Sequence, residues 1–305
     1  MLSPSFLKFI LVGVLTTSVY ADTRDCSPVG PRESYSTADF SRVVAKCKVL
    51  VNKYPKAGVL VVVDIDNTLL AMNQDLGSDQ WFNWQRKLLK DEPSSTDLVA
   101  DDVAGLLRVQ GILFALSEMH PPEPELPGYM SELQKLSLTT VVLTSRRYAF
   151  RDAAERELER NGYHFGATAL SVKERRGLFM PFDPAHPRAH GLSQEITEKI
   201  RDGLRPVSYS NGIYMTAGQH KGYMLRTLLA RAEPKQSFNA ILFVDDHKKN
   251  TLRMHEAFEG DPIHLVTFQY TREAGNVSNF NASQKRHVVD GWRRLKCSAE
   301  SVLVK

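Results

Sequence analysis

Two carboxylates stand where an apolar run of the sequence ends, which makes them candidates for catalysis or cation binding. Residues 59–63 (VLVVV) form a continuous run of mostly β-branched residues, typical of a strand that is buried on both faces. Asp64 and Asp66 follow it directly. Carboxylates at the end of a buried strand are costly unless they bind a cation or take part in catalysis. We therefore expect chemistry at this strand end.

Further polar groups follow other apolar runs. Thr144 ends a second run, and the pair Asp245–Asp246 closes a third, with Asn250 shortly after it. Lys221 stands just before a helical pattern. Parallel strands bring their carboxyl ends to one edge of a sheet, where ligands bind. The sequence therefore predicts that these groups meet at one site.

The elements that must position these groups alternate along the chain. Four strand-like runs and three intervening helical patterns predict an α/β fold with a Rossmann-like parallel sheet and helices on both faces. The runs are 59–64, 139–144, 240–245 and 263–268, and the helical patterns are 147–160, 221–231 and 249–259. In the irregular stretch 173–217, Asn211-Gly212 predicts a tight hairpin turn.

The chain divides into three predicted parts. Residues 69–137 contain helical patterns and a proline-rich break but no strand-like run, which predicts a mostly helical cap inserted after the first strand. Residues 22–68 and 138–305 then form the α/β core, and residues 1–21 form a signal peptide. An insertion that leaves the sheet at the carboxyl edge of its strands would cover a site there.

The signal peptide prediction rests on a short apolar stretch. Lys8 precedes the run 9–14 (FILVGV), and Val19-Tyr20-Ala21 places small residues at the positions of a cleavage site. The alternative is a buried N-terminal helix. A signal peptide implies a periplasmic or secreted protein.

Composition excludes several classes of protein. The 305 residues carry a net charge of +4, which is too small an excess to indicate binding to nucleic acid or to an acidic membrane surface. No apolar run reaches the roughly 18 residues of a membrane span, so we expect none after signal cleavage. The sequence leaves the oligomeric state open.

Three cysteines have different contexts. Cys47 lies in a helical apolar pattern over residues 40–51, which predicts a buried thiol. Cys26 and Cys297 stand near the two ends and could pair, or could remain free. No spacing of cysteine and histidine indicates a zinc site.

Four motifs, in order, resemble those of the haloacid-dehalogenase-like superfamily of aspartate-nucleophile phosphatases. They are Asp64-x-Asp66-x-Thr68, the run into Thr144, Lys221 with the following glycine, and Asp245-Asp246-x-x-x-Asn250. The resemblance covers about residues 57–270. The chain also resembles an uncharacterised exported bacterial branch of this superfamily (DUF2608-like), which has no known substrate.

The resemblance implies a phosphoric monoester hydrolase that acts through an aspartyl-phosphate. Asp64 would attack phosphorus, and Asp66 would protonate the leaving alcohol and later activate water. Lys221 and the Thr144 hydroxyl would bind the phosphoryl oxygens. The implied substrate is a small phosphorylated molecule. The alternatives are a phosphotransferase and a secreted binding or effector protein that keeps the fold without turnover.

The resemblance also implies a Mg²⁺ site. Its ligands would be Asp64, the backbone carbonyl of Asp66, and Asp245. Asp246 would bind the ion through water or would hold Lys221. Asn250 would orient one of the two adjacent acids.

Several neighbours of the motifs carry two interpretations each. Lys173 competes with Lys221 for the role of the catalytic lysine. Arg146 would bind phosphate or only begin a helix, and His247 would be a metal ligand or a residue outside the ligand set. The stripe Trp81, Trp84 and Leu88 would form an apolar lid or, as we favour, a packing face.

Overall fold

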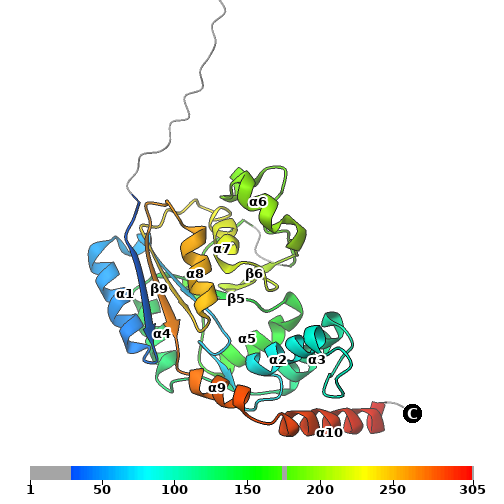
Figure 1. The fold of residues 1–305 in the computed structure, drawn as a ribbon. Helices are drawn as coiled ribbons and strands as arrows, with labels where there is room; N and C mark the ends of the chain where they lie inside the picture. The colour runs from blue at the N-terminus through cyan, green and yellow to red at the C-terminus, as the bar shows by residue number, and fades with distance from the viewer. Residues whose placement is uncertain (1–28, 174–176, 304–305) are drawn as a thin grey trace, which may run out of the picture.

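A seven-stranded sheet forms the centre of the molecule, and the computed structural model describes residues 29–173 and 177–303 (Figure 1). In spatial order its strands are β1 (Arg32–Thr37), β9 (His264–Tyr270), β8 (Ala240–Asp245), β2 (Val59–Val63), β5 (Thr139–Thr144), β7 (Ile213–Met215) and β6 (Ser208–Ser210). Neighbouring strands are parallel except β6, which runs antiparallel to β7. The predicted α/β class with a Rossmann-like sheet is confirmed.

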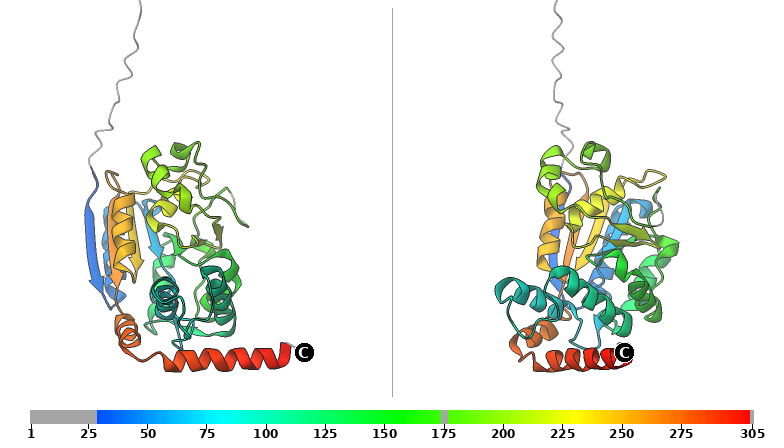
Figure 2. Two further views of the ribbon diagram at one scale, coloured as in Figure 1. Left: turned by 45° about the vertical axis from the view of Figure 1, so that its right-hand side comes forward. Right: turned by 90° about the vertical axis from the view of Figure 1, so that its right-hand side faces the viewer.

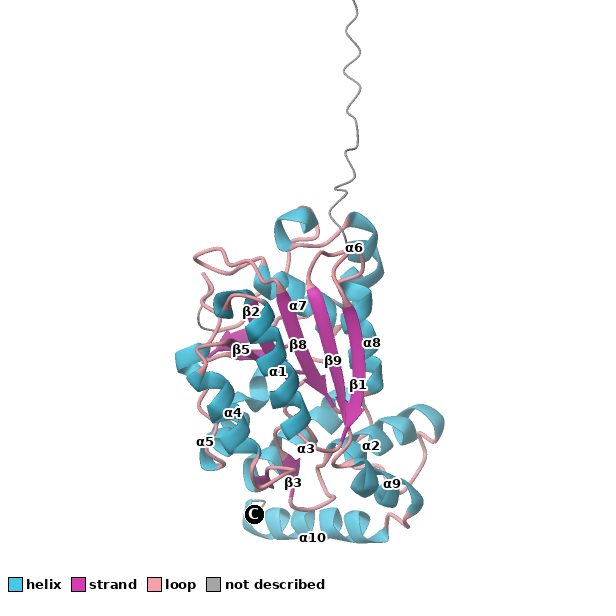
Figure 3. Ribbon diagram, turned by 90° about the vertical axis from the view of Figure 1, so that its left-hand side faces the viewer, coloured by secondary structure: helices cyan, strands magenta, loops and turns pink. Residues whose placement is uncertain are grey.

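Alternate residues of the central strand face the two layers of helices. Val61 and Val63 of β2 pack with α1 (Ser41–Lys53), α4 (Leu126–Lys135) and α5 (Arg151–Arg160), the layer that Figure 3 views from outside. Leu60 and Val62 pack on the opposite face with α7 (Lys221–Leu229) and α8 (Lys248–Ala257). Because both faces are covered, every residue of β2 is buried, as the apolar run predicts.

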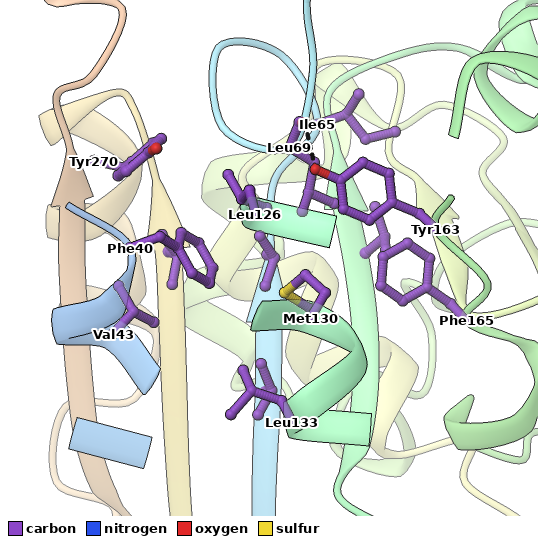
Figure 4. Packing of buried hydrophobic residues seen from close by; sticks show 14 of the residues in the cluster. Phe40, Val43, Ile65, Leu69, Leu126, Met130, Leu133, Tyr163, Phe165 and Tyr270 are labelled. Carbon is purple, nitrogen blue, oxygen red and sulfur yellow. Dashed lines mark hydrogen bonds between the residues drawn. The ribbon is translucent and has the colours of Figure 1, made fainter. Parts of the chain in front are cut away.

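The first of these layers also anchors the loop that follows β2. Leu126, Met130 and Leu133 of α4 are almost fully buried beneath it, beside Phe40 at the start of α1 (Figure 4). The Tyr163 hydroxyl donates a hydrogen bond of 2.9 Å to the carbonyl of Leu69 within that loop. The backbone that carries the candidate nucleophile is therefore supported from the core.

A cap stands beyond the carboxyl ends of the strands. Its helices α2 (Asp79–Asp91) and α3 (Val103–Leu116) share an apolar cluster with α9 (Ala274–Ala282) and α10 (Arg286–Leu303), and α10 runs below them in both views of Figure 2. The short strands β3 (Ala71–Met72) and β4 (Met119–His120) pair antiparallel, so the chain leaves and re-enters the core side by side. Within the predicted insertion 69–137, α4 packs against the sheet instead of the cap.

The remaining elements show where the sequence pattern fails. The hairpin at Asn211-Gly212 is confirmed, since both residues have positive φ (50° and 79°) between β6 and β7. The sequence pattern does not reveal the edge strand β1, because its residues, RESYST, are polar and three of the six are exposed. The helix α6 (Gln194–Ile200) also lies in the stretch predicted to be irregular.

Predictions for the cysteines and for the termini have different outcomes. Cys47 is a buried free thiol, as predicted, and burial raises its pKa to about 12. Cys297 is exposed, whereas Cys26 and the predicted signal peptide lie outside the described residues. Among the helices of residues 29–173 and 177–303, none combines the length and apolar character that crossing a membrane requires.

Candidate active site

A tight turn after β2 carries the first two candidate residues. The Asp64 N–H donates to the carbonyl of Val244 at 3.0 Å, which extends the pairing of β2 with β8. Next, the carbonyl of Ile65 accepts the N–H groups of the three residues from Thr68 to Leu70, at 2.9–3.1 Å. Asn67 has φ 55°, in the left-handed region that asparagine tolerates well. The turn fixes Asp64 and Asp66 at the sheet edge.

Lys221 lies between two buried carboxylates. Its Nζ is 2.6 Å from Asp64 Oδ1 and 2.6 Å from Asp245 Oδ2, and its side chain is 1% exposed. Gly222 allows this placement, because a Cβ there would lie 2.4 Å from the carbonyl oxygen of Arg253, so that α7 packs closely on α8. Lys173 is exposed. The structure therefore places Lys221, and not Lys173, beside the candidate nucleophile.

Asp245 is the fully paired member of the acidic pair. Asn250 Nδ2 donates to both of its oxygens, at 2.9 and 3.1 Å, and the His247 N–H donates to Oδ1 at 2.9 Å. Of the two alternatives left open by the sequence, the structure assigns the contacts with Lys221 and Asn250 to Asp245. This acid therefore orients the lysine.

Asp246 has spare capacity to bind a ligand. Its N–H donates to the Thr68 hydroxyl at 3.1 Å, but its buried Oδ1 has no hydrogen-bond partner among the described residues. Oxygens of Asp64, Asp245 and Asp246 lie within 4.8 Å of one another. Asp64 Oδ1 also lacks a hydrogen bond in the described part of the chain, although Lys221 lies beside it. A set of hard oxygen donors with such unsatisfied members fits a cation such as Mg²⁺.

The pKa values of Asp64 and Asp246 are raised, which means that their charged forms are disfavoured in the absence of a cation. Burial raises the pKa of Asp64 to about 7, against the opposing effect of Lys221. Burial, with the adjacent Asp245 charge, also raises the pKa of Asp246 well above its usual value. Burial disfavours the Lys221 ammonium, but the two carboxylates outweigh it and raise its pKa. A divalent cation would stabilise both aspartates in their charged form.

Arg146 holds the side chain of Asp66. Its Nε and Nη2 donate to the two carboxylate oxygens at 3.0 and 2.8 Å, and the guanidinium lies 4.1 Å from the ring centroid of Phe114 in the cap. Its Nη1 is buried without a partner in the described part of the chain. Sequence reasoning missed this positioning role, because nothing in the sequence pairs residues 66 and 146.

Thr144, predicted to bind the phosphoryl group, does not line the cavity between the sheet edge and the cap. It is fully buried, and its hydroxyl accepts a hydrogen bond of 3.1 Å from the N–H of Arg146. Its own carbonyl accepts one of 2.9 Å from the Thr216 hydroxyl. The neighbouring Ser145 lines the cavity instead.

The cavity has a volume of about 540 Å³ and separates the sheet edge from the cap. Asp64, Asp66, Lys221 and Asp246 form its base. Helix α2 contributes Asp79, Phe82, Asn83 and Arg86, which recur on one side of the helix. Its other side carries Trp81 and Trp84, which pack with α3, α9 and α10, and Leu88, which is buried. That stripe is therefore a packing face, as favoured from the sequence.

His247 connects the base to the cap. Its Nε2 lies 3.1 Å from Asp79 Oδ2 at the start of α2 and 3.8 Å from Asp246 Oδ2. The hydrogen bond with Asp79 is the main cause that raises the pKa of His247 to about 10. The imidazolium is thus an ion-pair partner of the cap.

Comparison with known proteins places this architecture in a family. The family described as "Protein of unknown function (DUF2608)" matches residues 37–297, which include every strand of the sheet except β1, the cap helices α2, α3 and α9, and all of the site residues above. The chain belongs to the DUF2608 family. No curated protein and no solved structure matches it. Because the description of the DUF2608 family assigns no activity, the function must be argued from the site.

Proposed function

We propose that this protein is a Mg²⁺-dependent phosphatase that hydrolyses a small phosphate monoester through a phosphorylated Asp64. The observation that carries the proposal is the buried Asp64 at a strand end, with Lys221 at 2.6 Å and two more carboxylates beside it. The order of these residues along the chain supports membership of the haloacid-dehalogenase-like superfamily. Export through residues 1–21 is part of the same proposal.

In the first step, a carboxylate oxygen of Asp64 attacks phosphorus. The new O–P bond forms as the bond from phosphorus to the ester oxygen breaks, and Asp66 gives a proton to that leaving oxygen. Lys221 offsets the negative charge on the phosphoryl oxygens. The products are a free alcohol and an aspartyl-phosphate.

In the second step, water releases the phosphate. Asp66, now a carboxylate, takes a proton from water as the water oxygen attacks phosphorus and the bond to Asp64 breaks. Arg146 keeps Asp66 in position for both proton transfers. Inorganic phosphate leaves, and Asp64 and Asp66 return to their starting states.

The residues present fit a Mg²⁺ ion. Asp64, Asp245, Asp246 and the backbone carbonyl of Asp66 would hold it, and Asp246 Oδ1 is the oxygen that most lacks a partner. When bound, the ion supplies positive charge that neutralises the transferring phosphoryl group. Asp245 would then act both on the ion and on Lys221.

Phosphate release from an aryl phosphate tests the proposal. The protein lacking residues 1–21 is assayed with Mg²⁺, with EDTA, and as Asp64→Asn. We expect release only with the metal and only with Asp64 present. If aryl phosphate is inert, a broad panel of phosphorylated metabolites follows, with acceptor alcohols added to detect phosphoryl transfer. Silence across that panel from folded, Mg²⁺-bound protein would contradict the proposal and favour a binding or effector role.

A further inference from the structure

The wall of the cavity carries a group of arginines that the proposed reaction does not use. Arg86 comes from α2, Arg147 from the loop after β5, and Arg205 from the loop before β6. We call these three residues the arginine wall. Among the described residues, none of the three has a carboxylate within the 4.0 Å of an ion pair.

The arginine wall is partly preorganised. Arg205 Nε donates to the carbonyl of Ala217 at 3.0 Å, and the Gln219 side chain bonds to both the N–H and the carbonyl of Arg205, at 3.0 and 2.9 Å. Burial lowers the pKa of Arg205, and the positive charges of Arg147 and Arg86 lower it further. Arg205 therefore lies close enough to Arg147 and to Arg86, across the same cavity, to be repelled by both.

The carboxylates of the cavity do not relieve this repulsion. Asp64 and Asp66 are paired with Lys221 and Arg146. Asp79 lies 3.1 Å and Asp246 3.8 Å from His247. Lys249 and Arg253 of α8 line the same cavity and add to the positive charge. An anionic group in the cavity would pair with guanidinium groups that have no carboxylate partner among the described residues, and phosphate matches the fork of an arginine particularly well.

We propose that the arginine wall binds a second phosphate group, so that the substrate is a bisphosphorylated small molecule whose other phosphate meets Asp64. The inference rests on the proposed function, because it assigns the base of the cavity to the reacting phosphate. It adds the specificity of the site: the cap, through Arg86, selects substrates by their second anionic group. A phosphate monoester without that group would use the base of the cavity alone.

Calorimetric titration of the Asp64→Asn protein with Mg²⁺ tests binding separately from turnover. The probes are alkanediol bisphosphates of increasing chain length, each paired with the monophosphate of the same chain. We expect at least one bisphosphate to bind about tenfold or more tightly than its monophosphate, the effect of one charge-assisted hydrogen bond. Arg86→Gln, Arg147→Gln and Arg205→Gln should each reduce that preference.

A matched control removes the same charge elsewhere. Arg201 is exposed and lies outside the cavity, so Arg201→Gln should leave the preference intact. Equal binding of every bisphosphate and its monophosphate would overturn the inference, and so would an equal effect of Arg201→Gln. A clear preference in a protein that hydrolyses no phosphate ester would support the subsite and contradict the phosphatase proposal. Hydrolysis of phosphate esters without a preference for bisphosphates would support the phosphatase proposal and contradict the subsite.

Discussion

The base of the cavity and its arginine wall differ in how their charged side chains are buried and paired. At the base, Lys221 and Asp64 are almost inaccessible, and each contacts the opposite charge of the other. On the wall, Arg86 and Arg147 are exposed and pair with no carboxylate of the described residues. Buried charges are tolerated only when partnered, whereas exposed cations remain hydrated at little cost. The side chains of the base are therefore held in one arrangement by their partners, while the arginines of the wall remain available to bind an anionic ligand.

Removing a charge at the base should have the largest effect. Lys221→Met leaves Asp64 and Asp245 buried together without their cation, so we expect loss of activity and a fall of about 3–5 kcal/mol in the free energy of unfolding. Lys249→Met removes the same charge from the rim of the cavity and should change that free energy by less than about 0.5 kcal/mol. Urea unfolding of both variants provides the comparison.

Equal losses of stability in these two lysine variants would contradict the distinction between the buried base and the exposed rim of the cavity. The variant Lys221→Arg tests separately the contribution of the positive charge and that of the contact geometry at residue 221. It keeps the positive charge but cannot fit the same 2.6 Å contacts, so stability should recover in part and activity should not.

The two faces of α2 offer a second comparison. Trp81 is 1% exposed within the cluster of the cap, so Trp81→Ala should cost about 3–5 kcal/mol if the cap unfolds with the core. Asn83 is exposed toward the cavity, and Asn83→Ala should change stability by less than about 0.5 kcal/mol. Thermal unfolding measured at one pH distinguishes them. A separate early transition in Trp81→Ala would show that the cap unfolds independently.

The pH dependence of stability gives a smaller, signed test of the base. Because the pKa of Asp64 rises from 3.8 to about 7 on folding, the folded protein binds this proton more tightly than the unfolded chain. The stabilisation is complete below about pH 4 and is lost as pH rises through about 7. In EDTA, the free energy of unfolding should therefore fall by about 1–3 kcal/mol across this range.

Two controls sharpen the pH test. Asp64→Asn cannot titrate, so its stability should change less between pH 4 and pH 8 in EDTA. Mg²⁺ should stabilise the wild type most at the upper end of this range, where the carboxylates are ionised. The same slope in both proteins would show that Asp64 does not titrate in this interval.

Much of the fold could be predicted because its central strands are continuous apolar runs. The runs 139–144 and 240–245 match β5 and β8 in both bounds. The edge strand β1 could not be found in this way, since one of its edges meets solvent and its residues are polar. Its partner β9 lies far along the chain, so no local signal links the two strands.

The residues of the candidate site could be predicted where they belong to a sequence motif. Roles that depend on contacts between side chains could not be predicted. Asp64, Asp66 and Lys221 do meet at the sheet edge. The division of roles between Asp245 and Asp246 depends on which way each side chain leaves the strand end, which sequence spacing does not specify. The contact of Arg146 with Asp66 joins separate loops, so only the folded chain shows it.

Locating the phosphoryl group during turnover tests the central claim most directly. Asp66→Asn should slow hydrolysis of the intermediate, because the activated water needs that carboxylate. After reaction with an aryl phosphate and Mg²⁺ and an acid quench, peptide mass spectrometry should find one phosphoryl group on Asp64. This adduct should be absent from the double variant with Asp64→Asn. Phosphate release without a modified Asp64, or a phosphoryl group on another residue, would contradict the account.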